Sequence, residues 1–219
     1  MAPRHRQGGF DPGLYDPNDE RDACGFGMIA QLDDQPSRAL VDTAIAALSR
    51  MTHRGGVAAD GLTGDGCGLL IRKPDAFLRA LAAESGIDPG ARFAAGLVFL
   101  PHDDALAAHC RATLEAELFR AGVAVKGWRV PPTDDTVCGQ LAKDTLPRIE
   151  QLFVEAGAEQ SGDAFTLALF LARRRSEQQL RTSVPDFYVV TLSPHSILAN
   201  GDRERRSSAC AREETAKRL

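Results

Sequence analysis

Cys24 has the strongest potential for covalent chemistry in this sequence, because it stands at the boundary between a leader without hydrophobic periodicity and an apolar run. Residues 1–23 are rich in Pro, Gly, Asp and Arg and show no hydrophobic periodicity, which is typical of a leader or loop. Removal of this leader would give Cys24 a free α-amino group, with a pKa of about 7.7–8.0, beside its own thiol. The thiol would then be the nucleophile and the amine its general base. A buried structural cysteine at the start of a strand is the alternative interpretation.

A second group of residues that could do chemistry lies in residues 52–66, a loop dense in glycine and aspartate. It places Arg54 in His-Arg-Gly-Gly and continues as Asp-Gly-Leu-Thr-Gly-Asp-Gly. The glycines suit a phosphate cradle, but a dinucleotide-binding loop needs a strand before it and a helix after it. Here a helix is predicted before the loop and a strand after it. Two interpretations stay open: a tight connection, or a backbone wall beside the catalytic residue with Arg54 as its polar anchor.

The elements that must position these residues alternate between strand and helix. Hydrophobic spacing and capping residues predict helices over 37–51 (with Ser37 as N-cap), 74–85, 103–121, 147–156 and 162–180. Apolar runs predict strands over 24–32, 67–74, 92–101, from 123 to the Pro131–Pro132 pair, and over 186–193 and 195–199. This mixture predicts an α/β or α+β domain.

The end of the sequence departs from this pattern. Asn200-Gly201 is a strong hairpin signal, which predicts a further strand from about residue 202. Residues 202–219 are instead almost wholly polar and charged, so they cannot supply the buried face of a strand. We therefore expect an aberrant tail over 202–219, either disordered or a loose polar helix. His195 belongs to the preceding strand edge, where we expect a structural role.

Composition narrows the class of protein. The 219 residues include 43% hydrophobic and 26% charged residues, with a net charge of −4, as in an ordinary globular domain. A negative net charge does not favour binding to nucleic acid. No apolar run approaches the roughly 20 residues that are needed to cross a membrane. The N-terminus lacks the apolar stretch of a signal peptide, so we expect a cytoplasmic protein. The five cysteines form no CxxC pair, so neither a disulfide framework nor a structural metal is expected.

Several segments together resemble one known family. The stretches LYDPNDERDACGFGMIA (14–30) and MTHRGGVAADGLTGDGCGLLI (51–71) are similar to the start of the large chain of glutamate synthase. GWRVPP (127–132), FLARRRSEQQL (170–180) and DFYVVTLSPHSILANG (186–201) resemble the same domain in the same order. That domain is a class II glutamine amidotransferase, an N-terminal-nucleophile hydrolase.

The resemblance implies a fold and a reaction. The fold would be α+β, part of a four-layer α-β-β-α sandwich over residues 24–201, with 1–23 as a propeptide. Cys24 would be the mature N-terminus and catalytic nucleophile, with Arg54 as the family's arginine beside it. The thiolate would attack glutamine, release ammonia and leave a γ-glutamyl thioester for water to hydrolyse. In the complete enzyme, an FMN and an iron–sulfur cluster would support reductive amination of 2-oxoglutarate, with the remaining synthase domains and a small reductase subunit as partners.

Two family segments are missing from the sequence. The glutamine-holding Arg-x-Ser-Thr-Asn and the oxyanion-hole His-Asn-Gly-Glu strings occur nowhere in it. We therefore expect a domain that is incomplete at its C-terminus, and an inactive truncated or frameshifted fragment is the rival interpretation. A different N-terminal-nucleophile hydrolase, acting on peptide or acyl amides, is a third. The electron donor of the complete enzyme, whether NADPH, NADH or ferredoxin, is left open.

Overall fold

A computed structural model describes residues 25–51, 55–64, 66–136 and 138–202. The helices of this part of the chain are α1 (Arg38–Ser49), α2 (Asp75–Glu84), α3 (Asp104–Arg120), α4 (Gln140–Thr145) and α5 (Gly162–Leu180). Its strands are β1 (Gly66–Arg72), β2 (Phe93–Leu100), β3 (Val123–Arg129), β4 (Arg148–Ala156), β5 (Tyr188–Ser193) and β6 (Ser196–Asp202). None of these helices is long and apolar enough to cross a membrane.

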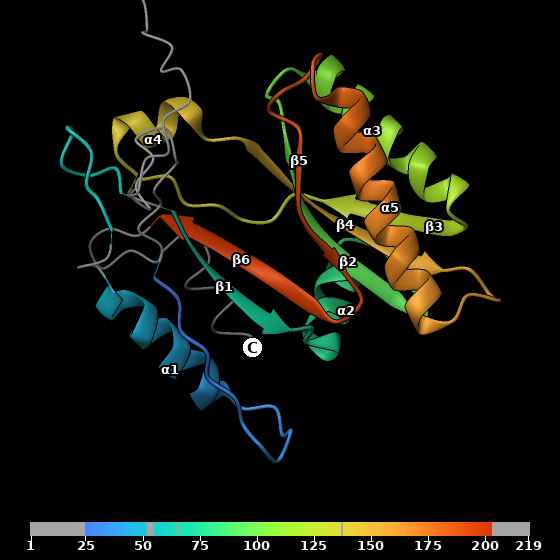
Figure 1. Ribbon diagram of the computed structural model, residues 1–219, viewed down its shortest axis with the longest axis horizontal. Coiled ribbons are helices and arrows are strands. Elements are labelled where there is room, and N and C mark those ends of the chain that lie inside the picture. Colours follow the sequence, from blue (N-terminus) through green and yellow to red (C-terminus); the bar gives the residue numbers. More distant parts are fainter. Residues whose placement is uncertain (1–24, 52–54, 65, 137, 203–219) are drawn as a thin grey trace, which may run out of the picture.

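The strands form two antiparallel sheets, and α2 packs on the face of the larger one that lies opposite α3 and α5. The larger sheet has the order β3-β4-β2-β5, and β1 pairs with β6 in the smaller one. Figure 1 shows α3 and α5 against the outer face of the four-stranded sheet, and α1 along the far side of β1 and β6. The order in space is therefore helix, sheet, sheet, helix. This arrangement confirms the α+β class and is part of an α-β-β-α sandwich.

Both faces of the four-stranded sheet are covered by other elements. Successive side chains of a strand point to opposite sides, so each strand contributes to both faces. The larger core cluster lies between the sheet and α3 and α5, and includes Val98 of β2 and Val154 of β4. On the other face, Phe93 and Phe153 pack with residues of α2. Ile197 of β6 packs against this second cluster, so it joins the two sheets.

Local capping explains where three predicted helices begin. The Ser37 hydroxyl accepts a hydrogen bond from the Leu40 amide of α1 at 3.3 Å. Asp103 and Ser161 accept equivalent bonds from the third residues of α3 and α5, at 2.8 and 3.2 Å. Each bond satisfies one of the N-terminal amides that a helix leaves without a partner. The predicted helices over 37–51, 74–85, 103–121 and 162–180 are all confirmed.

The predicted helix over 147–156 is wrong, because β4 occupies this segment. β4 pairs with β2 on one side and β3 on the other, so it is a central strand. A short apolar run such as Leu152–Val154 suits a buried helix or a buried strand equally well. The two neighbouring strands decide between them here. The short helix α4 was not predicted.

The predicted Asn200-Gly201 hairpin is also wrong. β6 continues through both residues to Asp202, and they pair with Gly68 and Cys67 of β1. It therefore extends one residue into the segment that we assigned to the tail. The chain instead turns at Pro194–His195, where the Ser193 hydroxyl accepts bonds from the His195 and Ser196 amides at 3.0 and 3.2 Å. At this turn the chain passes from the larger sheet to the smaller one. Residues 203–219 lie outside the described part.

Candidate functional site

The two predicted catalytic residues, Cys24 and Arg54, lie outside the described residues, as does His53. The structure does describe the segments that adjoin them in the chain. Residue 25 begins the segment that follows Cys24, and residue 55 begins the loop that follows Arg54. These two segments show what surrounds the predicted site.

The segment after Cys24 is not the buried strand that its apolar sequence predicts. Residues 25–32 form no ladder with any described strand, and much of the segment is exposed. Phe26, Met28 and Leu32 are 94%, 88% and 100% accessible to solvent. An apolar run becomes a strand only where a partner edge and a covering layer accept it. The predicted strand over 24–32 is therefore wrong for its described residues.

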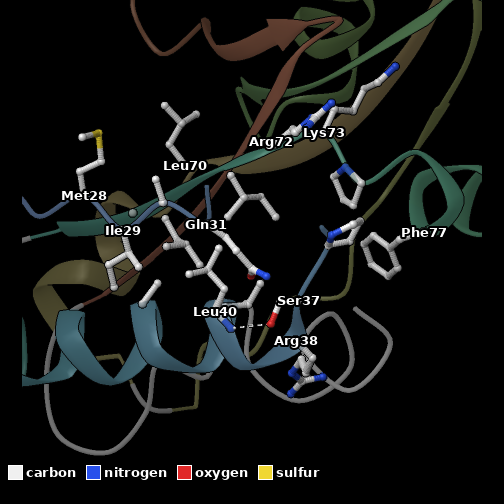
Figure 2. A pocket seen from close by; sticks show the side chains of 18 of the residues that line it. Met28, Ile29, Gln31, Ser37, Arg38, Leu40, Leu70, Arg72, Lys73 and Phe77 are labelled. Atoms are coloured by element: carbon white, nitrogen blue, oxygen red, sulfur yellow. Dashed lines mark hydrogen bonds between the residues drawn. The ribbon is translucent and has the colours of Figure 1, made fainter. Parts of the chain in front are cut away.

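A large cavity lies between this segment, α1 and β1. Its volume is about 1670 Å³. Figure 2 shows Met28 and Ile29 from the segment, Leu40 from α1 and Leu70 from β1 around it. The residues named here are apolar side chains. Gly25, the residue that follows Cys24 in the chain, is one of the residues that line the cavity.

Three cations, Arg38, Arg72 and Lys73, line the end of the cavity away from Met28 (Figure 2), and each has a carboxylate partner. Arg38 pairs with Asp42 on α1 at 2.9 Å. Arg72 pairs with Asp34, which raises the pKa of the arginine above its usual value. The Lys73 ammonium lies 3.0 Å from an Asp75 carboxylate oxygen and donates to the Phe93 carbonyl at 2.8 Å. The interactions of Arg72 and Lys73 tie the end of β1 to its neighbours.

The glycine-rich loop folds into a small hairpin. Val57 and Gly64 form an antiparallel bridge, and the Ala58 amide donates to the Thr63 carbonyl at 2.7 Å. Asp60 lies at the tip, where one carboxylate oxygen accepts bonds from the Leu62 and Thr63 amides at 3.1 and 2.8 Å. This compact structure fits the interpretation of the loop as a tight connection. Its role as a wall beside Cys24 stays a prediction.

The hairpin caps α4, a helix about 80 residues further along the chain. The other oxygen of Asp60 accepts from the Leu141 amide at 3.3 Å, and the Thr63 hydroxyl accepts from the Ala142 amide at 3.2 Å. Leu141 and Ala142 are the second and third residues of α4, whose amides an N-cap side chain ordinarily satisfies. The N-cap residue itself is Gly139, which has no side chain to offer. Asp60 and Thr63 thus replace the missing cap.

Electrostatics keeps the capping carboxylate ionised. The Thr63 hydroxyl donates to Asp60 at 2.6 Å, and this bond is the main cause that holds the pKa of Asp60 far below its usual value. The amides of Thr63, Leu62 and Leu141 lower this pKa further. A negative charge at the N-terminus of a helix is also favoured by the helix dipole.

The remaining residues considered from the sequence have structural surroundings. His195 is exposed at the β5–β6 turn, where its carbonyl accepts from the Lys73 amide at 2.8 Å, as the structural interpretation predicts. Cys110 and Cys138 are buried, and Cys67 is half-buried in β1. Burial raises the pKa of the Cys110 thiol, which disfavours its reactive thiolate. Within the described ranges, no group of three or more His, Cys, Asp or Glu side chains could hold a metal ion.

Sequence reasoning missed the contact between the loop and α4. Asp-Gly-x-Thr is a recognisable turn sequence, since Asp and Thr side chains readily bond to nearby amides. The sequence carries no signal that the same side chains also bond to Leu141 and Ala142. Only the tertiary structure brings these segments together.

Comparison with known proteins assigns the chain to a family. The class-II glutamine amidotransferases match residues 24–205. The glutamate synthase [NADPH] large chains of Azospirillum brasilense and Bacillus subtilis are 40% and 32% identical to this chain over 191 and 190 residues. The ferredoxin-dependent glutamate synthase 1 of Arabidopsis thaliana is 35% identical over 192 residues.

These alignments cover 85–86% of this chain but only 12% of each relative. The resemblance to glutamate synthase is therefore confirmed for a domain that is a small part of those enzymes. The family match extends over most of the chain, from Cys24 through both sheets. The chain thus belongs to the class-II glutamine amidotransferases.

Proposed function

We propose that this chain carries the glutamine-hydrolysing step of a glutamate synthase. The observation that carries the proposal is the family match, whose first residue is Cys24. The similarity to glutamate synthases at 32–40% identity supports this assignment among the amidotransferases. Burial disfavours Cys110 and Cys138 as nucleophiles.

The chemistry starts with removal of residues 1–23. Cys24 then has an α-amine with a pKa of about 7.7–8.0, which accepts the proton of its thiol. The thiolate attacks the side-chain amide carbon of glutamine, the C–N bond breaks, and ammonia leaves with that proton. Water hydrolyses the resulting γ-glutamyl thioester, which releases glutamate and restores the thiol. Arg54 serves as the polar anchor near this terminal residue.

The rest of the reaction belongs to parts of the complete enzyme beyond this domain. Ammonia is consumed there in the reductive amination of 2-oxoglutarate. We assign the FMN and the iron–sulfur cluster to those parts. The remaining synthase domains are the partners, together with a small reductase subunit. The relatives include both NADPH and ferredoxin enzymes, so the electron donor stays open.

N-terminal processing tests the identity of the nucleophile. We expect the intact mass of protein purified from its native host to correspond to a chain that begins at Cys24. Without a free amine, Cys24 would lose its general base. Glutaminase activity in a protein that still carries residues 1–23 would contradict the mechanism.

Covalent labelling tests the reaction. In the full-length native protein, a diazoketone analogue of glutamine should label Cys24 and leave Cys67, Cys110 and Cys138 unmodified. Cys24→Ala should abolish glutamine-dependent synthesis but preserve ammonia-dependent synthesis, since ammonia bypasses the thiol. Cys67→Ala is the matched control and should retain both activities. Loss of both activities in Cys24→Ala would instead indicate that the thiol is needed for folding.

A further inference from the structure

We propose that the outer face of α5 is an interface at which a second copy of this chain docks, with the two α5 helices antiparallel. Four residues of this face, Asp163, Leu167, Phe170 and Arg174, form what we call the α5 stripe. The helix belongs to the layer that covers the four-stranded sheet (Figure 1). None of the four residues lines the cavity described above, so the stripe is a separate surface.

The α5 stripe points away from the sheet. At about 100° per residue, its four side chains fall within roughly 60° of one another around the helix. Leu169 and Ala172, which α5 buries against the sheet, lie on the opposite side. Leu167 and Phe170 are 57% and 56% exposed. An outward helical face ordinarily carries polar residues, so these two side chains form an apolar centre without a covering layer among the described residues.

The charges at the two ends of the stripe select a second copy as the partner. Along the helix the order is acidic, apolar, apolar and basic, with spacings of four, three and four residues. These spacings are the same in both directions, so an antiparallel copy places Asp163 opposite Arg174 and Leu167 opposite Phe170. A twofold axis repeats each contact. The interface then contains two pairs of opposite charge on either side of four apolar side chains.

Both charges can reach a second copy. Asp163 is exposed in the first turn of α5, and it forms no ion pair with any residue that the structure describes. The Arg174 side chain is 63% exposed, and it donates to Glu177 of the same helix at 3.1 Å. Glu177 also pairs with Arg173 at 3.0 Å, so it keeps a cationic partner when Arg174 turns outward.

The neighbouring helix leaves room for this approach. α3 lies beside α5 in the same layer, and its exposed residues Ala108, Ala112 and Ala116 recur at intervals of four residues (Figure 1). These side chains are small and uncharged, so they place neither bulk nor charge in front of a second helical layer. Phe119, which is 82% exposed, adds a large apolar side chain near the end of α3.

Disulfide cross-linking between copies of the full-length protein tests this geometry. Asp163→Cys and Arg174→Cys proteins are mixed in equal amounts and oxidised under mild conditions, and mass spectrometry identifies the linked peptides. We expect a disulfide between positions 163 and 174 of different copies. Leu141→Cys is the matched control, because Leu141 is 48% exposed on α4, which lies far from α5 in Figure 1. It should form no disulfide with the Arg174→Cys protein.

A charge exchange tests the same pairs without cysteine. Asp163→Arg and Arg174→Asp should each weaken dimerisation about tenfold in sedimentation equilibrium, because a twofold interface makes both charge pairs repulsive. The two substitutions together should restore the affinity to within about twofold. Absence of the disulfide between positions 163 and 174, or failure of the combined substitutions to restore dimerisation, would overturn the inference. A monomer in which both introduced cysteines resist a thiol reagent would assign the stripe to another part of the same polypeptide and would equally overturn it.

Discussion

Glu150 is a buried acid between the four-stranded sheet and α3, and its replacement tests the electrostatics of this interface. One of its carboxylate oxygens accepts a hydrogen bond from Arg111 at 2.8 Å and forms an ion pair with Arg148, whose Nε lies 2.7 Å away. The Glu150 side chain is only 4% exposed, while the two arginines are 25% and 30% exposed. Glu150→Gln keeps the shape of the side chain but leaves both guanidinium groups without this charge.

The expected loss in the free energy of unfolding follows from how deeply Glu150 and its two arginine partners are buried. Breaking a buried ion pair costs about 3–5 kcal/mol, and an exposed pair is worth about 0–1 kcal/mol. Both arginines can turn partly toward water, so we expect Glu150→Gln to lower the free energy of unfolding by about 2–3 kcal/mol. For a chain of this size that corresponds to a fall in Tm of roughly 4–12 °C. Urea unfolding at neutral pH, followed by circular dichroism, measures the change.

Asp104 provides a matched control, because it pairs with the same arginine. It accepts from Arg148 at 2.7 Å but is 93% exposed. Asp104→Asn should therefore cost only about 0.5 kcal/mol, including a small loss of favourable charge in the first turn of α3. Equal costs for the two substitutions would refute the claim that burial sets the value of these pairs.

Three further predictions follow from other sites. Gly96→Ala should lower the free energy of unfolding, measured with urea, by about 1–3 kcal/mol, because the new Cβ would lie 2.1 Å from the Thr191 carbonyl oxygen. Gly162→Ala is the control: its Cβ would enter open space, so it should be neutral or slightly stabilising. Cys110 should resist a thiol reagent at pH 8 in the native state and react after unfolding, as mass spectrometry would show, since it is fully buried with a raised pKa. The pKa of Asp60 is lowered in the folded protein, so its charge stabilises the fold fully above the usual aspartate pKa and is lost only as pH falls through the lower native pKa. NMR of the Asp60 carboxylate should therefore show no titration near pH 4. A normal titration there would contradict its role as a helix cap.

The local features of this fold could be predicted from the sequence. Ser37, Asp103 and Ser161 mark helix starts because each cap bonds to an amide only three residues away. The strand β2 follows from a continuous apolar run of strand length, Phe93–Leu100. The family followed from the residues around Cys24 and Arg54, whose types and spacing do not depend on knowing the fold.

Only the tertiary structure decided features that depend on distant partners. β4 is a strand because β2 and β3 supply the neighbouring edges, whereas its sequence alone suits a helix equally well. Asn200-Gly201 does not form a turn, because β1 continues to pair with β6 through both residues. Asp60 and Thr63 read locally as turn residues, yet their second bonds reach α4, on the other side of a long stretch of chain. In each case the same hydrogen-bonding groups could bond either to nearby residues or to residues far away in the sequence. The packing of the folded chain decides which of these bonds form.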